Sequence, residues 1–270
     1  ELSQLNASPV AGEPQMLSGE LAIVLQAGLD LHARSQGAFD PTVGPLVNAW
    51  GFGPEGVKEP SPAELEAARD RVGGEKLLLA ASKDRSDAAV LIRSQADVFI
   101  DLSAIAKGYG VDVVSDLLMN LGYERSLVEI GGEIRARGMG RHAAPWRVGI
   151  ERPQEGPPDV EVVLPLSNRS MATSGNYRNF RMDDGRKVTH IIDPRNGSPV
   201  EHGLGSVSVL ADTCMEADAW ATALYVLGAE EGLKLADQEG VAALFLTPEG
   251  RGGTLKSSPS QTFPTLPSSP

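Results

Sequence analysis

The chain has 270 residues, of which 41% are apolar and 22% are charged, so it can bury a sizeable core and is not disordered throughout. Its 24 Lys and Arg residues and 36 Asp and Glu residues give a net charge of −12. This acidity argues against binding to a nucleic-acid backbone, because such binding needs a basic surface. The longest apolar stretches are far shorter than the roughly 18 residues of a membrane-spanning helix. A single cysteine, Cys214, excludes an internal disulfide and a multi-cysteine metal site.

The spacing of apolar residues predicts strands that come in groups between a few helices. In chain order we expect a helix over 17–34, an exposed Gly- and Pro-rich connection over 51–62, a polar helix over 62–71, strands over 76–79, 89–92 and 98–101, a helix over 104–121, strands over 126–130, 134–137, 146–151, 160–166, 170–174, 187–192 and 205–211, helices over 215–227 and 230–238, and a strand over 241–247. Grouped strands favour an α+β fold over a doubly wound parallel sheet. We interpret residues 1–250 as a single domain, in which two lobes are possible, and the Ser- and Pro-rich residues 251–270 as an extended or disordered tail.

A loop rich in Gly and Pro follows the first expected helix. It runs from Gly37 through Ala38, Phe39 and Asp40 and continues to Gly53. Prolines and glycines fix an irregular backbone, which suits a ligand-contacting loop with aromatic side chains as one wall. A rigid structural turn explains the same pattern equally well.

The segment 101–110 joins an expected strand to an expected helix. Asp101 ends the strand, and Ala104 and Lys107 lie at the start of the helix. The free N–H groups and the positive dipole end of a helix N-terminus favour a bound anion. Asp101 also suits the N-cap position of that helix, which would explain it without a ligand.

The segment 189–199 delivers a histidine and an acid in one turn. His190 and Asp193 stand at the end of an apolar strand that includes Ile192, before a turn rich in Pro, Asn and Gly. A histidine and a carboxylate held together by a rigid turn suit general acid–base work. The alternative is a structural histidine whose hydrogen bonds are satisfied within the fold.

The segment 216–222 lies in an expected helix. Asp218 and Thr222 are four residues apart and therefore face the same side of it. A carboxylate and a hydroxyl in an Ala-rich turn are oxygen ligands of the kind that Mg²⁺ prefers. The polar face of a surface helix would show the same spacing.

Taken in order, these segments and two others closely resemble the FAD:protein FMN transferase family, the ApbE flavin transferases. The resemblance rests on six ordered motifs, which read FDPTVGPL at 39–46, DLSAIAKGY at 101–109, EIGGEIR at 129–135, ATSG at 172–175, HIIDPRNG at 190–197 and ADAWATA at 217–223. It spans nearly the whole chain apart from the tail. It implies an α+β fold of mixed sheets with packed helices, and a flavin site in the cleft between two halves.

The resemblance also implies a reaction. Members of this family cleave the pyrophosphate of FAD with Mg²⁺, release AMP and attach FMN to a Thr or Ser of a target flavoprotein. Many are exported lipoproteins at the periplasmic face of the inner membrane, and their targets are subunits of the Rnf and sodium-pumping NADH:quinone oxidoreductase complexes. We therefore expect a periplasmic enzyme, held to the inner membrane by a lipid anchor in its full-length form, that does not bind nucleic acid.

Carried over motif by motif, the resemblance assigns roles to individual residues. The residues expected to contact FAD are Ala38, Phe39, Asp40, Asp101, Lys107 and Ile192. The Ala104 carbonyl and the side chains of Asp218 and Thr222 are expected to bind Mg²⁺. His190 is expected to be the general base for the acceptor hydroxyl. Some members carry a second acid one turn from the metal-binding Asp, where this chain has Ala221.

Two other functions fit the same residues. A plain FAD pyrophosphatase would use water as the acceptor and yield FMN and AMP, and the sequence does not separate it from a transferase because the acceptor belongs to another protein. A non-catalytic flavin-binding protein would hold FAD without turning it over, although His190 and Asp218 count against this alternative.

Overall fold

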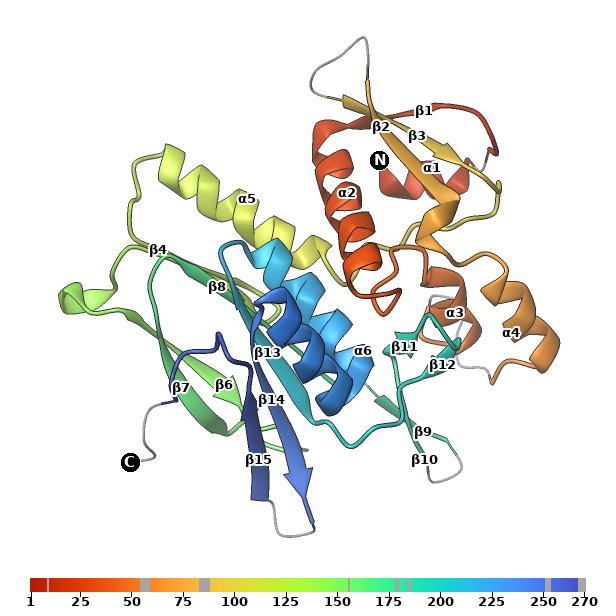
Figure 1. Ribbon diagram of the computed structural model, residues 1–270. Coiled ribbons are helices and arrows are strands. Elements are labelled where there is room, and N and C mark those ends of the chain that lie inside the picture. Colours follow the sequence, from red (N-terminus) through yellow and green to blue (C-terminus); the bar gives the residue numbers. More distant parts are fainter. Residues whose placement is uncertain are drawn as a thin grey trace. The chain divides into compact units, whose positions relative to one another are not determined.

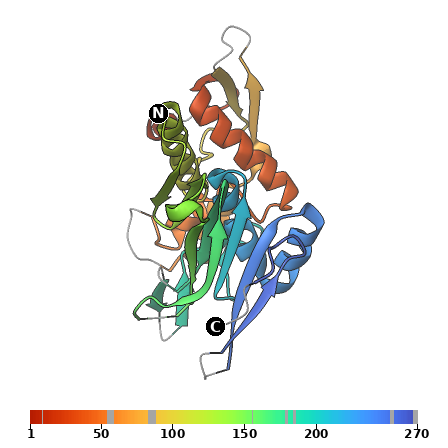
Figure 2. The same cartoon turned by 90° about the vertical axis from the view of Figure 1, so that its left-hand side faces the viewer.

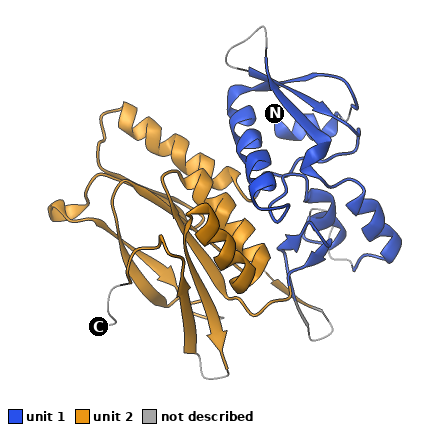
Figure 3. Ribbon diagram, in the orientation of Figure 1, with its two compact units in different colours: residues 1–103, 188–200 blue, residues 104–187, 201–270 orange. Residues whose placement is uncertain are grey.

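The computed structural model describes residues 1–8, 10–53, 59–82, 88–154, 156–177, 180–183, 186–250 and 254–266. The chain divides into two compact units, which Figure 3 shows in different colours. Unit 1 comprises Glu1–Ser103 and Val188–Val200, and unit 2 comprises Ala104–Lys187 and Glu201–Pro270. The expected connection over 51–62 lies partly outside the described residues.

Unit 1 combines helices with small antiparallel sheets. Its elements are α1 (Leu2–Ala7), β1 (Gln15–Ser18), α2 (Gly19–Arg34), α3 (Gly44–Ala49), α4 (Pro62–Arg69), the 3₁₀ helix η1 (Gly74–Lys76), β2 (Leu77–Ala81), β3 (Ala88–Arg93), β11 (Ile192–Asp193) and β12 (Ser198–Pro199). The strands pair in the order β1-β3-β2, and β11 pairs with β12. Ser18 caps α2 by accepting the N–H of Leu21 at 3.3 Å. The buried residues of α2 follow the spacing of one helix face: Val24, Leu25, Gly28 and Leu31.

Unit 2 is built on a larger sheet. Its elements are α5 (Ala106–Asn120), β4 (Ser126–Ile130), β5 (Glu133–Arg137), the 3₁₀ helix η2 (Arg141–Ala143), β6 (Trp146–Glu151), β7 (Val160–Leu166), β8 (Arg169–Gly175), β9 (Phe180–Asp183), β13 (Ser206–Ala211), α6 (Cys214–Glu239), β14 (Ala242–Glu249) and β15 (Thr254–Pro259), and β10 (Arg186–Thr189) continues the chain into unit 1. The sheet has the order β15-β14-β13-β8-β5-β4, and each of its pairings is antiparallel (Figures 1 and 2). Grouped antiparallel strands with packed helices confirm the predicted α+β class.

Side-chain alternation along the strands gives the two faces of this sheet different partners. On β14, Ala242, Leu244 and Leu246 belong to a core cluster that also contains residues of β6 and β7. Phe245 points to the opposite face, where its ring lies 2.9 Å from the position that a Cβ on Gly232 of α6 would take. One face of the sheet is therefore covered by α6 and the other by the β6–β7 ribbon (Figure 1).

α6 consists of two helical segments that meet at a kink, which agrees with the two helices predicted over 215–227 and 230–238. It is kinked at Gly228, whose φ of +79° and ψ of −175° are not helical. A residue without a Cβ adopts this conformation easily. The predicted break is therefore a kink, and most of the residues before it are buried. Within the described ranges, none of the helices combines the length and the apolar character that a bilayer crossing requires.

The predicted strand over 98–101 is wrong. The backbone groups of Ile100 bond to a side chain instead, because the Asn6 amide donates to the Ile100 carbonyl at 2.8 Å and accepts its N–H at 3.0 Å. The N–H of Asp101 donates to the Pro41 carbonyl at 2.7 Å. These polar groups are satisfied without a neighbouring strand, so the segment is an extended connection.

Two short helices, α1 and α3, were not predicted. Each has six residues, which is too short for apolar periodicity to distinguish it from a loop. Pro45 lies in the first turn of α3, where a missing N–H has no cost because that N–H has no helical acceptor.

The C-terminal tail contributes a strand to the sheet. β15 pairs with β14, and the Ser260 hydroxyl then accepts the Ala243 N–H at 2.9 Å and donates to the Val241 carbonyl at 2.7 Å. Phe263 is 7% exposed and belongs to the same core cluster as β6 and β7. The described part of the tail is thus extended and packed rather than disordered, and residues 251–253 and 267–270 lie outside the described residues.

Phe263→Ala should lower the free energy of unfolding by about 3 kcal/mol, because it removes a buried aromatic ring and leaves a cavity. Urea unfolding followed by circular dichroism measures the loss. The exposed neighbour Thr265→Ala serves as the control and should change stability by less than about 0.5 kcal/mol. Equal stability of the two variants would contradict the packed tail.

Candidate functional site

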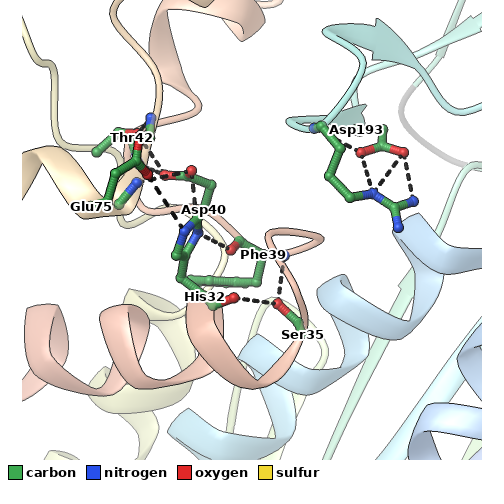
Figure 4. Close-up of polar contacts among 10 residues, drawn as sticks. His32, Ser35, Phe39, Asp40, Thr42, Glu75 and Asp193 are labelled. Atoms are coloured by element: carbon green, nitrogen blue, oxygen red, sulfur yellow. Dashed lines mark hydrogen bonds and ion pairs between the residues drawn. The ribbon is translucent and has the colours of Figure 1, made fainter.

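Asp40 organises the loop that follows α2 (Figure 4). Its carboxylate is 6% exposed. Oδ1 accepts the N–H of Thr42 at 2.7 Å and the hydroxyl of Thr42 at 2.6 Å, and Oδ2 accepts the N–H of Gly74 at 3.2 Å. Thr42 Oγ1 in turn accepts the N–H of Gly73 at 2.7 Å. Both Asp40 oxygens are thus bonded within unit 1, and they fix the loop to the turn before β2.

His32 on α2 contacts the same loop from the other side. Its Nδ1 lies 3.0 Å from the Phe39 carbonyl oxygen and 3.3 Å from Asp40 Oδ2. The hydrogen bond to Asp40 is the main cause of a raised pKa of His32, and partial burial of the ring works in the opposite direction. Ala38 and Phe39 are themselves buried. These contacts support the rigid-turn interpretation of this segment, and its role in FAD binding stays a prediction.

Asp101 lies against this loop, since its N–H donates to the Pro41 carbonyl. Its Oδ1 accepts the N–H of Ser103 at 2.9 Å in a local turn. The prediction that Asp101 caps the following helix is wrong, because α5 begins at Ala106 and has Ile105 as its N-cap residue. Four residues separate Asp101 from the first residue of α5, and its Oδ1 caps the local turn at Ser103 instead of the helix.

The segment after β10 forms an internally bonded turn in unit 1. Asp193 is 6% exposed and pairs with Arg195, whose Nη2 lies 2.8 Å from Oδ2 (Figure 4). Ile192 is 4% exposed and packs in a hydrophobic cluster with Leu46. The side chains of both residues therefore stabilise the turn itself. His190 meets the ring of Phe52 edge-on, with the two ring centroids 6.4 Å apart.

In unit 2, Asp218 stands on the buried part of α6 and contacts the start of α5. Asp218 is 4% exposed, and its Oδ2 accepts the N–H of Gly108 at 3.0 Å. Gly108 lies in the first turn of α5, where backbone N–H groups have no acceptor within the helix. A Cβ on Gly108 would stand 2.3 Å from the Cys214 carbonyl oxygen and 2.8 Å from Asp218 Cβ, so glycine permits this close approach. The alternative interpretation of Asp218 as part of a solvent-exposed helix face is wrong.

The charge of Asp218 is held in a largely dry environment. Burial is the main cause that raises the pKa of Asp218 to about 6, and the hydrogen bond from Gly108 works in the opposite direction. The negative charge of Glu133 raises this pKa further, and the positive charge of Lys107 lowers it. Lys107 on α5 and Glu133 on β5 form an ion pair with Nζ 2.5 Å from Oε1.

Thr222 follows Asp218 by one turn of α6, and its Oγ1 lies 3.2 Å from Ser174 Oγ on β8. Ala104 precedes Gly108 by four residues, which is the spacing of a helical hydrogen bond. The Gly108 N–H donates to Asp218 instead, so the first turn of α5 does not use the Ala104 carbonyl. This region of unit 2 therefore combines carboxylate, hydroxyl and carbonyl oxygens.

Such a donor set suits a hard divalent cation better than a soft metal. Among the residues that the structure describes, no group of three or more His, Cys, Asp and Glu side chains lies close enough together to hold a metal ion. A cation near Asp218 would therefore depend on mixed oxygen donors completed by water or substrate. Cys214 is buried, and this burial raises the pKa of its thiol, so it offers no thiolate. Ala221 is fully buried and offers no ligand atom in its side chain.

The predicted site residues fall into two groups. Those in unit 1 are Ala38, Phe39, Asp40, Asp101, His190 and Ile192, and those in unit 2 are Ala104, Lys107, Asp218 and Thr222. The boundary between Ser103 and Ala104 passes through the segment expected to join a strand to a helix. Each group is built within its own unit, and the expected flavin cleft stays a prediction. No role was expected for Glu133 or Ser174. The only feature of the sequence that points to them is that each lies in one of the six motifs.

His32→Gln should lower the free energy of unfolding more at pH 6 than at pH 9. Folding raises the pKa of His32 above its usual 6.5. The stability from the protonated ring is therefore fully present below pH 6.5 and is lost as the pH rises through the folded-state pKa. A hydrogen bond to a charged group contributes about 1.5 kcal/mol, and we expect a difference of that order between the two pH values.

Urea unfolding of wild type and variant at both pH values measures this difference. His142→Gln removes an exposed histidine and serves as the control. A loss in His32→Gln that does not change with pH would contradict the contact with Asp40.

The model of the ApbE family matches residues 1–245. The FAD:protein FMN transferase of Haemophilus influenzae is 41% identical over 261 residues, which cover 96% of this chain and 75% of that protein. The protein of the same name from Vibrio cholerae is 40% identical over 248 residues, which cover 91% of this chain and 72% of that protein.

Solved structures with similar folds are also ApbE proteins. The apo form of the Pseudomonas stutzeri flavinyl transferase ApbE matches with a TM-score of 0.84 and 38% identity, over 97% of this chain and 78% of that one. The ApbE protein of Thermotoga maritima matches with a TM-score of 0.83 and 29% identity, over 97% of this chain and 81% of that one. The resemblance carried by the six motifs is thereby confirmed. The chain belongs to the ApbE family, whose matched relatives are transferases.

Proposed function

We propose that this protein transfers FMN from FAD to a Thr or Ser hydroxyl of a target flavoprotein and releases AMP. The observation that carries the proposal is the buried Asp218 carboxylate at the junction of α5 and α6, in a chain that matches FAD:protein FMN transferases over nearly its full length. A surface or packing role does not explain an aspartate that is 4% exposed and whose carboxylate accepts only one hydrogen bond from the described part of the chain.

The residues around Asp218 fit a Mg²⁺ ion. Magnesium prefers oxygen ligands, uses one or two carboxylates and keeps sites open for water and phosphate. Asp218, the Thr222 hydroxyl and the Ala104 carbonyl would hold the ion. The bound cation would stabilise the ionised form of the Asp218 carboxyl, which burial disfavours. When bound, such an ion neutralises the phosphate oxygens of a dinucleotide and of the leaving AMP.

The remaining predicted residues would bind and orient FAD. Lys107, with a side chain that is 48% exposed, would contribute positive charge beside the diphosphate. Ala38, Phe39 and Asp40 would act through the shape of their loop, because both oxygens of Asp40 already bond to Thr42 and the 73–74 turn. Asp101 and Ile192 would likewise act indirectly. Each stabilises a backbone segment, and that segment would form part of the flavin nucleotide site.

The proposed general base is His190. The acceptor oxygen attacks the phosphorus of the FMN half, the bond from that phosphorus to the oxygen shared with AMP breaks, and AMP leaves with this oxygen. The proton of the acceptor hydroxyl passes to an imidazole nitrogen of His190. A hydroxyl is a poor nucleophile near neutral pH, so the base must lie within about 3 Å of it when the target is bound.

We further propose that the acceptor belongs to a subunit of the Rnf or sodium-pumping NADH:quinone oxidoreductase type, and that transfer takes place in the periplasm by a protein anchored through lipid in its full-length form. The support for both statements is the resemblance of the six motifs to exported flavin transferases.

Asp218→Asn should reduce flavin transfer by roughly 100-fold or more while leaving the fold intact, because the neutral amide no longer attracts the cation. The protein is incubated with FAD, Mg²⁺ and a target domain that contains an acceptor Thr, and the target is then weighed by mass spectrometry. Wild type should add one FMN to each target. Glu230→Gln, which neutralises an exposed acid on the same helix, serves as the control and should retain full activity.

The same measurement separates the rival functions. Free FMN and AMP beside an unmodified target would show a pyrophosphatase, and unchanged FAD would show a binding protein. Full turnover by Asp218→Asn would mean that the cation site is assigned to the wrong residue.

A further inference from the structure

Glu133 is a buried acid in unit 2 with only half of its hydrogen-bonding capacity used. It is the first residue of β5, and its side chain is 4% exposed. Oε1 lies 2.5 Å from Lys107 Nζ, whereas Oε2 is buried and has no hydrogen-bond partner within the described ranges. Buried carboxylate oxygens are normally satisfied, so an unpaired one requires an explanation.

The glycine turn between β4 and β5 determines where Oε2 lies. Gly131 has a φ of +66°, a conformation that favours glycine. A Cβ on Gly131 would stand 3.3 Å from Glu133 Oε2 and 3.7 Å from Lys107 Cδ. The turn therefore packs directly against the ion pair and shields it from water on that side.

A purely structural ion pair does not account for this arrangement. Lys107 is 48% exposed, so water solvates its ammonium well with or without Glu133. Glu133, at 4% exposed, has lost its hydration and has received one bond in return. Burial of a carboxylate with a single half-exposed partner is unfavourable, and apolar replacements of such pairs are often more stable.

The charges around Asp218 are also unbalanced. Glu133 pairs with Lys107, and the N–H of the next residue, Gly108, donates to Asp218 Oδ2 at 3.0 Å, so both acids contact adjacent residues in the first turn of α5. The ammonium of Lys107 pairs with Glu133 and not with Asp218, so the two buried carboxylates and one ammonium leave a net charge of about −1 in a region of low dielectric constant. A bound cation would remove this imbalance.

We propose that Glu133 is the second acidic residue of the cation site around Asp218, and that its Oε2 contributes the negative charge that attracts the ion. This inference rests on the proposed function, because that function requires a cation at Asp218. It adds the first residue of β5 to a site otherwise formed by α6 and the turn that precedes α5. It also gives Lys107 a defined role as the group that limits the negative charge of the site.

The test measures cation binding directly, without FAD or turnover. The full chain is stripped of metal with EDTA and titrated at pH 8 with Mn²⁺, which accepts the same oxygen ligands as Mg²⁺, while electron paramagnetic resonance reports the free ion. Glu133→Gln should weaken Mn²⁺ binding by about tenfold or more. Glu124→Gln, which removes an exposed negative charge from the same unit, is the matched control and should bind within about twofold of wild type.

A second variant predicts a change of the opposite sign. Lys107→Met removes the positive charge of the ion pair and should tighten Mn²⁺ binding, whereas a structural role of the pair predicts no change in either variant. Thermal unfolding in EDTA provides a further distinction, because Glu133→Gln should unfold no earlier than wild type once the half-paired charge is gone. If Glu133→Gln does not fold, the Lys107→Met titration decides alone.

The outcomes separate this inference from the proposed function. Wild-type affinity in Glu133→Gln, together with lost affinity in Asp218→Asn, would overturn the role of Glu133 and leave the proposed function standing. No Mn²⁺ binding by wild type at millimolar concentrations would overturn the cation site itself, and the role of Glu133 with it. Unchanged affinity in Lys107→Met would contradict the charge balance.

Discussion

The hydrogen bond from the Gly108 N–H to Asp218 fixes the start of α5 to α6 in unit 2. It joins the first turn of α5 to the buried part of α6, two segments 110 residues apart in the chain. It satisfies the Gly108 N–H, which has no acceptor within α5. It also favours the ionised form of the buried Asp218 carboxyl. The bond requires glycine, because a Cβ at this position would collide with the Cys214 carbonyl.

The three buried acids Asp40, Asp218 and Glu133 differ in how many of their oxygens are bonded within the fold. Asp40 in unit 1 accepts three hydrogen bonds from Thr42 and Gly74 in addition to its contact with His32, and these bonds account for its burial. Asp218 and Glu133 in unit 2 each have one bonded oxygen within the described residues. Unpaired buried charge is destabilising, and the cation that we propose would offset it at this place in the fold.

Much of the fold could be predicted from the sequence where long apolar patterns meet clear turn residues. The strands over 146–151 and 160–166 have the same bounds in the structure, because alternating residues of β6 and β7 bury one face in a single cluster. Prediction failed where partners come from distant segments. Residues 98–101 read as a strand, yet the Asn6 side chain takes the hydrogen bonds that a strand would have made. The tail of Ser and Pro residues read as extended or disordered, and β14 gives it an edge on which to pair.

The sequence alone determined the residue types, their spacing and the family, because six ordered motifs and the four-residue interval between Asp218 and Thr222 are linear properties. It could not determine which charges meet. The approach of Glu133 to Lys107 and Asp218 depends on the order of strands in the sheet and on two glycines that let backbone segments come close. The periodicity of the apolar residues specifies which face of a helix or strand is buried. Tertiary packing determines which charged side chains of other elements lie against that face.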